Sequence, residues 1–216
     1  MRRVVLGTFW LFVALAAGRA AAQEPRLVGR LPDQTRHAVE AVLDSARAAG
    51  LPTEPLIDRA LEGATKGASG DRILAAVRRL RTDLAASRNA LGAGVTAPEI
   101  SAGASALRAG ARPADLARLR ELQSGQPVTV PAAVLTDLVA LGVPPDTATM
   151  AVLALAGRIK DSEYLALRRN VERDVALGAT PVAALEFQFE SAGDRFSSGA
   201  SPFGPPPSSR PGPHKP

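Results

Sequence analysis

Residues 110–145 read GARPADLARLRELQSGQPVTVPAAVLTDLVALGVPP and hold the clearest turn pattern of the chain. Gly110 comes three residues before Pro113, and the same spacing returns with Gly142 and Pro145, 32 residues further on. Glycine just past a helix end supplies the left-handed residue that closes the helix, and proline fits the first turn of the next one. We therefore expect one helix to end at each glycine and another to begin at each proline.

The same spacing of glycine and proline continues beyond this stretch. Gly178 and Pro181 repeat the spacing 36 residues after Gly142. The chain is rich in Ala, Leu and Arg, which favour helices, and it lacks the period-two alternation of half-buried strands. These features predict an all-α protein with helices over residues 33–49, 53–66, 70–91, 97–109, 113–124, 131–141, 145–156, 161–177 and 181–191.

A period of 32 to 36 residues is typical of stacked helix-turn-helix units, which cannot bury their apolar faces singly. Short connections make neighbouring helices pack antiparallel or at a steep angle. The predicted fold class is therefore all-α, built from antiparallel helical hairpins, and two arrangements stay open. The hairpins form either a short α-solenoid-like repeat stack or an irregular bundle in which the glycine spacing reflects ordinary helix lengths.

Helix caps and inner faces can also be named. Thr96 and Glu99 fit a capping box, and other candidate caps are Ser69, Thr129, Asp161 and Thr180. The expected core consists of small aliphatic side chains, on one stripe Ile73, Val77, Leu80 and Leu84, and on another Tyr164, Leu165, Leu167, Val171 and Val175. Phe187 and Phe189 are expected to cover the end of the stack.

The first 22 residues have the parts of a secretory signal peptide: Arg2 and Arg3, an apolar run over 4–18, and small residues before Gln23. A retained membrane anchor is the competing interpretation, but a helix that crosses a bilayer requires roughly 20 apolar residues, and Arg19 ends this run earlier. No Cys follows the run, so a lipid-anchored form is excluded. We expect cleavage near Gln23 and an exported protein, periplasmic or secreted.

The predicted organisation is therefore a signal peptide over residues 1–22, an extended linker over 23–32, a helical domain over 33–191 and a tail over 192–216. The tail is rich in Pro, Gly and Ser, which predicts disorder. Phe196 and Phe203 within it are either docking elements for a partner or incidental residues of a linker.

The formal net charge of +5 does not indicate a nucleic-acid partner, because it resides at the two ends. Residues 23–196 hold 21 basic and 21 acidic residues. Two basic clusters lie within expected helices, one at Arg78, Arg79, Arg81 and Arg88 and one at Arg168, Arg169 and Arg173. Acidic neighbours such as Asp71, Asp83, Glu172 and Asp174 predict exposed, salt-bridged faces, and no aromatic platform accompanies them.

Side chains for catalysis are scarce. Cys is absent, and His37 is the sole His of the expected domain and is predicted to lie at the surface, so the Cys-His, Ser-His-Asp and common zinc arrangements cannot form. Glu54, Asp58 and Glu62 share one helix face, where they either hold a divalent cation or form a solvated row. Arg59, about 100° around the helix from Asp58, is not expected to neutralise them.

The Gly-rich stretch 63–70 lacks the spacing of a phosphate-binding loop, so it is interpreted as a connection between helices. No residue is therefore assigned to catalysis, to a cofactor or to a metal ion. The sequence favours a non-enzymatic exported protein that presents a grooved surface to another protein or an envelope component, with no nucleic acid as partner. Two alternatives stay open: a carboxylate-based metal-binding protein or hydrolase, and an envelope protein that keeps its N-terminal anchor.

Overall fold

The computed structural model describes residues 24–193, and all regular structure in that range is helical. The elements are η1 (Pro25–Leu27, a 3-10 helix), α1 (Asp33–Ala48), α2 (Glu54–Thr65), α3 (Gly70–Leu91), α4 (Ala97–Arg108), α5 (Pro113–Leu122), α6 (Thr129–Ala140), α7 (Pro145–Leu155), α8 (Asp161–Ala176) and α9 (Pro181–Gly193). The all-α prediction is confirmed. Each expected α-helix is present, with ends that differ by at most two residues.

The segment before α1 differs from the extended linker expected over residues 23–32. Pro25 begins a 3-10 turn, and Leu27 is completely buried against residues of α1, α2 and α3. Leu31 is buried in the same cluster, so two apolar side chains fasten the segment to the domain. The expected signal peptide lies outside the described residues, and so does the expected tail from residue 194 onward.

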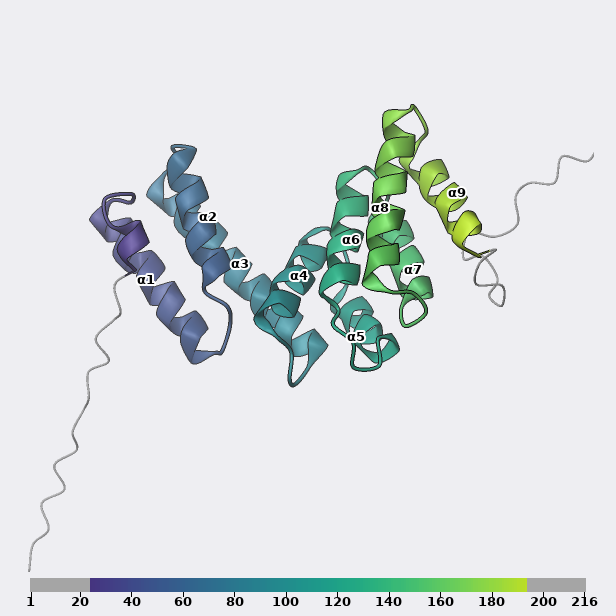
Figure 1. Cartoon of the computed structure of the whole chain (residues 1–216). Coiled ribbons are helices and arrows are strands. Elements are labelled where there is room, and N and C mark those ends of the chain that lie inside the picture. Colours follow the sequence, from purple (N-terminus) through teal and green to yellow (C-terminus); the bar gives the residue numbers. More distant parts are fainter. Residues whose placement is uncertain (1–23, 194–216) are drawn as a thin grey trace, which may run out of the picture.

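The helices follow one another along an elongated molecule, from α1 at one end to α9 at the other (Figure 1). In one row α4, α6 and α8 pack in succession, and in the other α3, α5 and α7 do so. The rows are joined where α3 packs on α4 and α6 packs on α7, and α9 packs on α8. Helices that contact their next-but-one neighbours along two rows form a stack of hairpins.

Equivalent turns of successive hairpins lie against each other. Gly110 closes α4 with a φ of +110°, and a Cβ added to it would lie 2.9 Å from the Cβ of Pro145 in α7. Gly142, which closes α6, is similarly placed against Pro181 of α9. The glycine that makes the left-handed turn therefore also leaves space for the proline that begins a helix of the next hairpin.

At the other end of the hairpins, buried polar side chains join the loops. Glu99, 3% exposed, accepts hydrogen bonds from the backbone N–H of Thr96 (2.9 Å), from the N–H of Val128 (3.2 Å) and from Nη1 of Arg120 (2.9 Å). The capping box predicted at Thr96 is thereby confirmed. Further along the stack, Oε1 of Gln123 accepts a hydrogen bond from the N–H of Gly157 at 3.2 Å.

The apolar side chains form two clusters. The first extends from η1 to α4 and contains the whole predicted stripe Ile73, Val77, Leu80 and Leu84. The second extends from Leu91, at the end of α3, to Phe189 in α9. α3 contributes to both clusters, and α1 and α2 contact the remaining helices chiefly through it.

Three details of the sequence prediction are wrong. Leu165 is exposed whereas its neighbour Tyr164 is buried, where its hydroxyl donates to the carbonyl of Val152 at 3.2 Å and burial raises its pKa. Phe189 is 9% exposed and packs as expected, but Phe187 is 64% exposed. The predicted caps Thr129 and Asp161 are instead the first residues of α6 and α8.

The other two predicted caps stand where expected. Ser69 is the N-cap residue of α3, although its side chain makes no capping hydrogen bond, and Oγ1 of Thr180 accepts a hydrogen bond from the N–H of Ala183 at 3.3 Å. Between residues 24 and 193, no helix combines the length and the apolar character needed to cross a bilayer.

Candidate functional site

A groove of about 380 Å³ lies between α2 and α4, with α3 beneath it. It exists because α2 does not pack on α4 in the way that α4 packs on α6. The floor consists of Leu80 and Leu84. The α2 wall carries Asp58, Arg59 and Glu62, and the α4 wall carries Ser101, Ser105 and Arg108.

Helical periodicity places these residues on one side of their helices. Asp58 and Glu62 are four residues apart on α2, and on α4 Ser101 is followed by Ser105 and Arg108 at steps of four and three. The Ser101 hydroxyl donates to the carbonyl of Ala97 at 3.0 Å, and the Ser105 hydroxyl donates to the carbonyl of Ser101 at 3.1 Å. Both donors are used within α4, so these hydroxyls offer acceptor oxygens to a ligand in the groove.

Two of the three carboxylates in the predicted row are held in ion pairs. Glu54 accepts hydrogen bonds from both terminal nitrogens of Arg26, at 2.6 and 2.8 Å. Glu62 pairs with Lys66 at 2.6 Å and with Arg59 at 2.8 Å, and these cations lower its pKa to about 2. The expectation that Arg59 leaves the row unneutralised is therefore wrong. Arg59 is three residues before Glu62, a spacing at which side chains meet on a helix.

Asp58 and Arg108 differ from these pairs. Both are exposed, and neither has an ion-pair partner among residues 24–193. They stand on opposite walls, with the apolar floor between them. The groove thus has one unpaired charge of each sign on its walls, beside the Arg59–Glu62 pair, above a floor of two leucines that are 7% and 0% exposed.

The remaining predicted positions lie elsewhere. His37 is exposed on α1, and its Nε2 is 3.0 Å from Nη2 of Arg36. The other terminal nitrogen of Arg36 donates to the buried carboxylate of Glu40. The stretch 63–70 connects α2 to α3, as expected. Within the described range, no three His, Cys, Asp or Glu side chains are grouped closely enough to hold a metal ion.

The two basic clusters named from the sequence differ in their ion pairing. On α8, Arg168 is 3.6 Å from Asp137 and 3.9 Å from Glu172, and Arg173 pairs with Asp174 at 3.0 Å. Salt bridges are thus confirmed there for Arg168 and Arg173, whereas Arg169 has no ion pair with a described residue. On α3, Arg88 donates to the carbonyl of Ala49, and none of the other arginines has an ion pair with a described residue, so the prediction fails for that helix.

The groove residues Ser101, Ser105 and Arg108 were not identified from the sequence. The available signal was weak: two serines and an arginine on one face of a predicted helix that is otherwise mostly apolar. A second, larger cavity of about 650 Å³ lies between the η1 segment and the end of α2. We assign no site to it. The chain matches no family model, no curated protein and no solved structure.

Proposed function

We propose that this protein is a non-enzymatic interaction module, exported from the cytoplasm, that receives a segment of another protein in the groove between α2 and α4. The observation that supports the proposal is the pairing of a leucine floor with unpaired charges on the two walls, at Asp58 and Arg108. A partner segment that carries one charge of each sign matches this arrangement. The two charges select the orientation of the segment, and the buried leucines form a closed floor beneath it.

The stacked architecture is consistent with this function. Helical stacks bind partners on extended surfaces formed by several hairpins rather than in a closed pocket. The groove draws its walls and floor from three helices, and its carboxylate Glu62 is engaged by two cations, which opposes a role as a catalytic base. The predicted signal peptide supports export, and the intact mass of protein recovered from its host tests whether the first 22 residues are removed.

Site-specific photo-crosslinking in the native host tests the groove. A photoreactive amino acid at Ser105, on the groove wall, is expected to give a discrete adduct, whereas the same residue at Met150, exposed on α7, is expected to give none. Asp58→Arg should abolish the Ser105 adduct while leaving the melting temperature unchanged, because Asp58 is exposed and unpaired. Equal adducts at both positions, or an adduct that survives Asp58→Arg, would disprove a specific role for the groove.

A further inference from the structure

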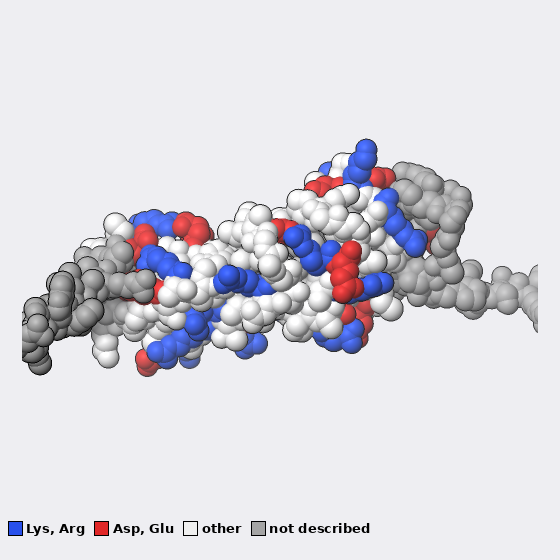
Figure 2. All heavy atoms as spheres, turned by 90° about the horizontal axis from the view of Figure 1, so that it is seen from below, with Lys and Arg blue, Asp and Glu red and all other residues white. Residues whose placement is uncertain are grey.

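α3 carries an unusual excess of positive charge. It contains Arg72, Arg78, Arg79, Arg81 and Arg88 but only Asp71 and Asp83, whereas residues 23–196 as a whole are balanced. Arg72, Arg78 and Arg79 are exposed. We call these three residues the α3 cationic face. Figure 2 shows several basic side chains, with few acidic ones beside them, along the lower edge of the left half of the molecule.

The sequence of α3 explains why this face is unpaired. Three and four residues from Arg72 and Arg78 the helix offers only Ala, Leu, Thr and Arg, so no carboxylate stands at pairing distance on the same helix. Asp83 follows Arg79 by four residues, but its Oδ2 is buried and makes no hydrogen bond. Elsewhere exposed arginines such as Arg47 and Arg118 do pair, with Asp44 at 2.8 Å and Glu121 at 3.0 Å. Arg30, Arg108, Arg158 and Arg169 are also exposed and have no ion pair with a described residue, but they stand singly on different segments, whereas the α3 cationic face gathers three such arginines on one helix.

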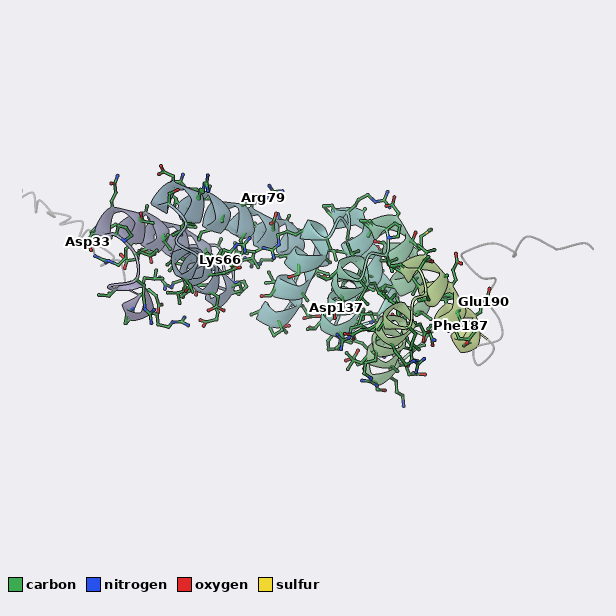
Figure 3. All side chains as sticks on the ribbon, turned by 90° about the horizontal axis from the view of Figure 1, so that it is seen from above. Asp33, Lys66, Arg79, Asp137, Phe187 and Glu190 are labelled. Atoms are coloured by element: carbon green, nitrogen blue, oxygen red, sulfur yellow. The ribbon has the colours of Figure 1, made fainter. Side chains whose placement is uncertain are left out.

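The face is separate from the groove. Leu80 and Leu84 belong to the side of α3 that forms the groove floor, whereas Arg79 projects from the outer side. In Figure 3, Arg79 lies along the upper edge of the left half of the molecule. Arg72 and Arg79 are two turns apart, about 10 Å along the helix axis. Guanidinium groups at such a spacing can each take one carboxylate of a partner in a bidentate pair.

The surroundings of these arginines distinguish between anionic partners. On the outer side of α3, Ala75 lies between Arg72 and Arg78 and Thr82 follows Arg79, and both are exposed. A membrane-binding helix places large apolar side chains beside its cations, and single-stranded nucleic acid requires aromatic platforms, and neither is present on this face. An acidic protein segment needs only the charges and a flat backbone to lie against.

We propose that the α3 cationic face binds an acidic segment of a protein partner, with carboxylates about 10 Å apart. The inference rests on the proposed function only in that the partner is a protein. It assigns a second contact surface, on the other side of α3 from the groove, and the two surfaces are tested independently.

The test uses the full mature chain and a fluorescein-labelled ten-residue poly-glutamate peptide, with binding followed by fluorescence anisotropy at low and physiological salt. Arg72→Glu, Arg78→Glu and Arg79→Glu are combined in one variant. The matched control combines Arg30→Glu, Arg158→Glu and Arg169→Glu, which are also exposed and unpaired and change the net charge equally. The α3 variant is expected to lose affinity by about tenfold or more, because three attractions become repulsions, and the control by about twofold or less.

Three results would overturn the proposal: no binding of the peptide to the wild-type chain, equal losses in both variants, or tighter binding to vesicles of phosphatidylglycerol that also depends on the α3 arginines. The last result would assign the face to a membrane surface. Circular dichroism of both variants excludes unfolding as the cause. Crosslinking at Ser105 reports the groove separately, so failure of one surface is distinguishable from failure of the other.

Discussion

Gly110 lies directly against Pro145, and the pair joins two successive hairpins of the stack. The same relation returns between Gly142 and Pro181. The sequence pattern that ends and begins helices is thus also a packing contact between repeats. Its two roles can be separated by experiment, because Gly178 has a similar φ of +102° with no atom near its missing side chain, whereas Gly110 has +110°.

We expect Gly110→Ala to lower the free energy of unfolding by about 3 kcal/mol, and Gly178→Ala by about 1 kcal/mol. Both variants place a Cβ in the left-handed region, but only the first also forces it into Pro145. Urea denaturation followed by circular dichroism measures both values. Equal losses in the two variants would show that Gly110 serves only the turn.

Gln123 joins two loops from a position that is 2% exposed. Gln123→Ala leaves the N–H of Gly157 without its acceptor, so we expect a loss of about 1–2 kcal/mol. The control is Gln126→Ala, at an exposed side chain in the same loop, which should change stability little. Hydrogen exchange at Gly157 provides a local measurement, and exchange that stays as slow as in the wild type would refute the link.

Glu99 has a larger set of partners. Glu99→Gln replaces a carboxylate, whose two oxygens accept from several donors, with an amide that can accept from only some of them. We expect the free energy of unfolding to fall by about 2–3 kcal/mol. Glu121→Gln is the matched control, because Glu121 is exposed and pairs only with Arg118. Chemical denaturation of both variants at neutral pH tests this, and similar midpoints for the two would contradict it.

Stability should decrease on acidification. Burial opposes the charged form of Glu99, but hydrogen bonds from Thr96 and Val128 and the charge of Arg120 outweigh it, so its pKa in the folded chain is lowered. The guanidinium of Arg112 likewise lowers the pKa of Asp115. A lowered folded pKa means that the unfolded chain binds more protons at acidic pH, so the stabilisation is present above the ordinary carboxyl pKa and is lost as pH falls through the folded value.

Denaturation midpoints measured between neutral pH and pH values of about 3 should therefore fall, and they should fall less steeply for Glu99→Gln than for the wild type. A profile of unchanged steepness in the variant would show that Glu99 does not contribute to the acid sensitivity.

The two phenylalanines of α9 should respond differently to truncation. Phe189 is buried against the second cluster, so Phe189→Ala is expected to cost about 3 kcal/mol. Phe187 projects from the end of the molecule, near Glu190 (Figure 3), and Phe187→Ala should leave the unfolding midpoint nearly unchanged. Thermal melts of the two variants suffice, and a large effect of Phe187→Ala would mean that its ring is covered in solution.

Local chemistry made most of the fold predictable. Glycine and proline act on their own turns, so helix ends near Gly110 and Pro145 could be located without knowledge of the tertiary structure. The error at Leu165 has a different origin. α8 is rich in charged residues and has no sharply bounded apolar face, so the helices packed against it decide which of two adjacent side chains is buried, here Tyr164 rather than Leu165.

The groove could not be predicted, because it depends on the separation of α2 and α4, which are distant in sequence. That separation is set where α4 crosses α3: a Cβ on Gly103 would lie 2.3 Å from the hydroxyl of the buried Ser87. The close crossing draws α4 onto the C-terminal half of α3 and away from α2. A pattern within one helix gives no information on such a spacing.

α3 and α4 both contribute side chains to the two apolar clusters, α3 through Leu84 and Leu91 and α4 through Ile100 and Ala106, so a force between the two halves of the molecule would pass through this helix pair. Tension along the long axis would then act first on the crossing where Gly103 of α4 approaches Ser87 of α3.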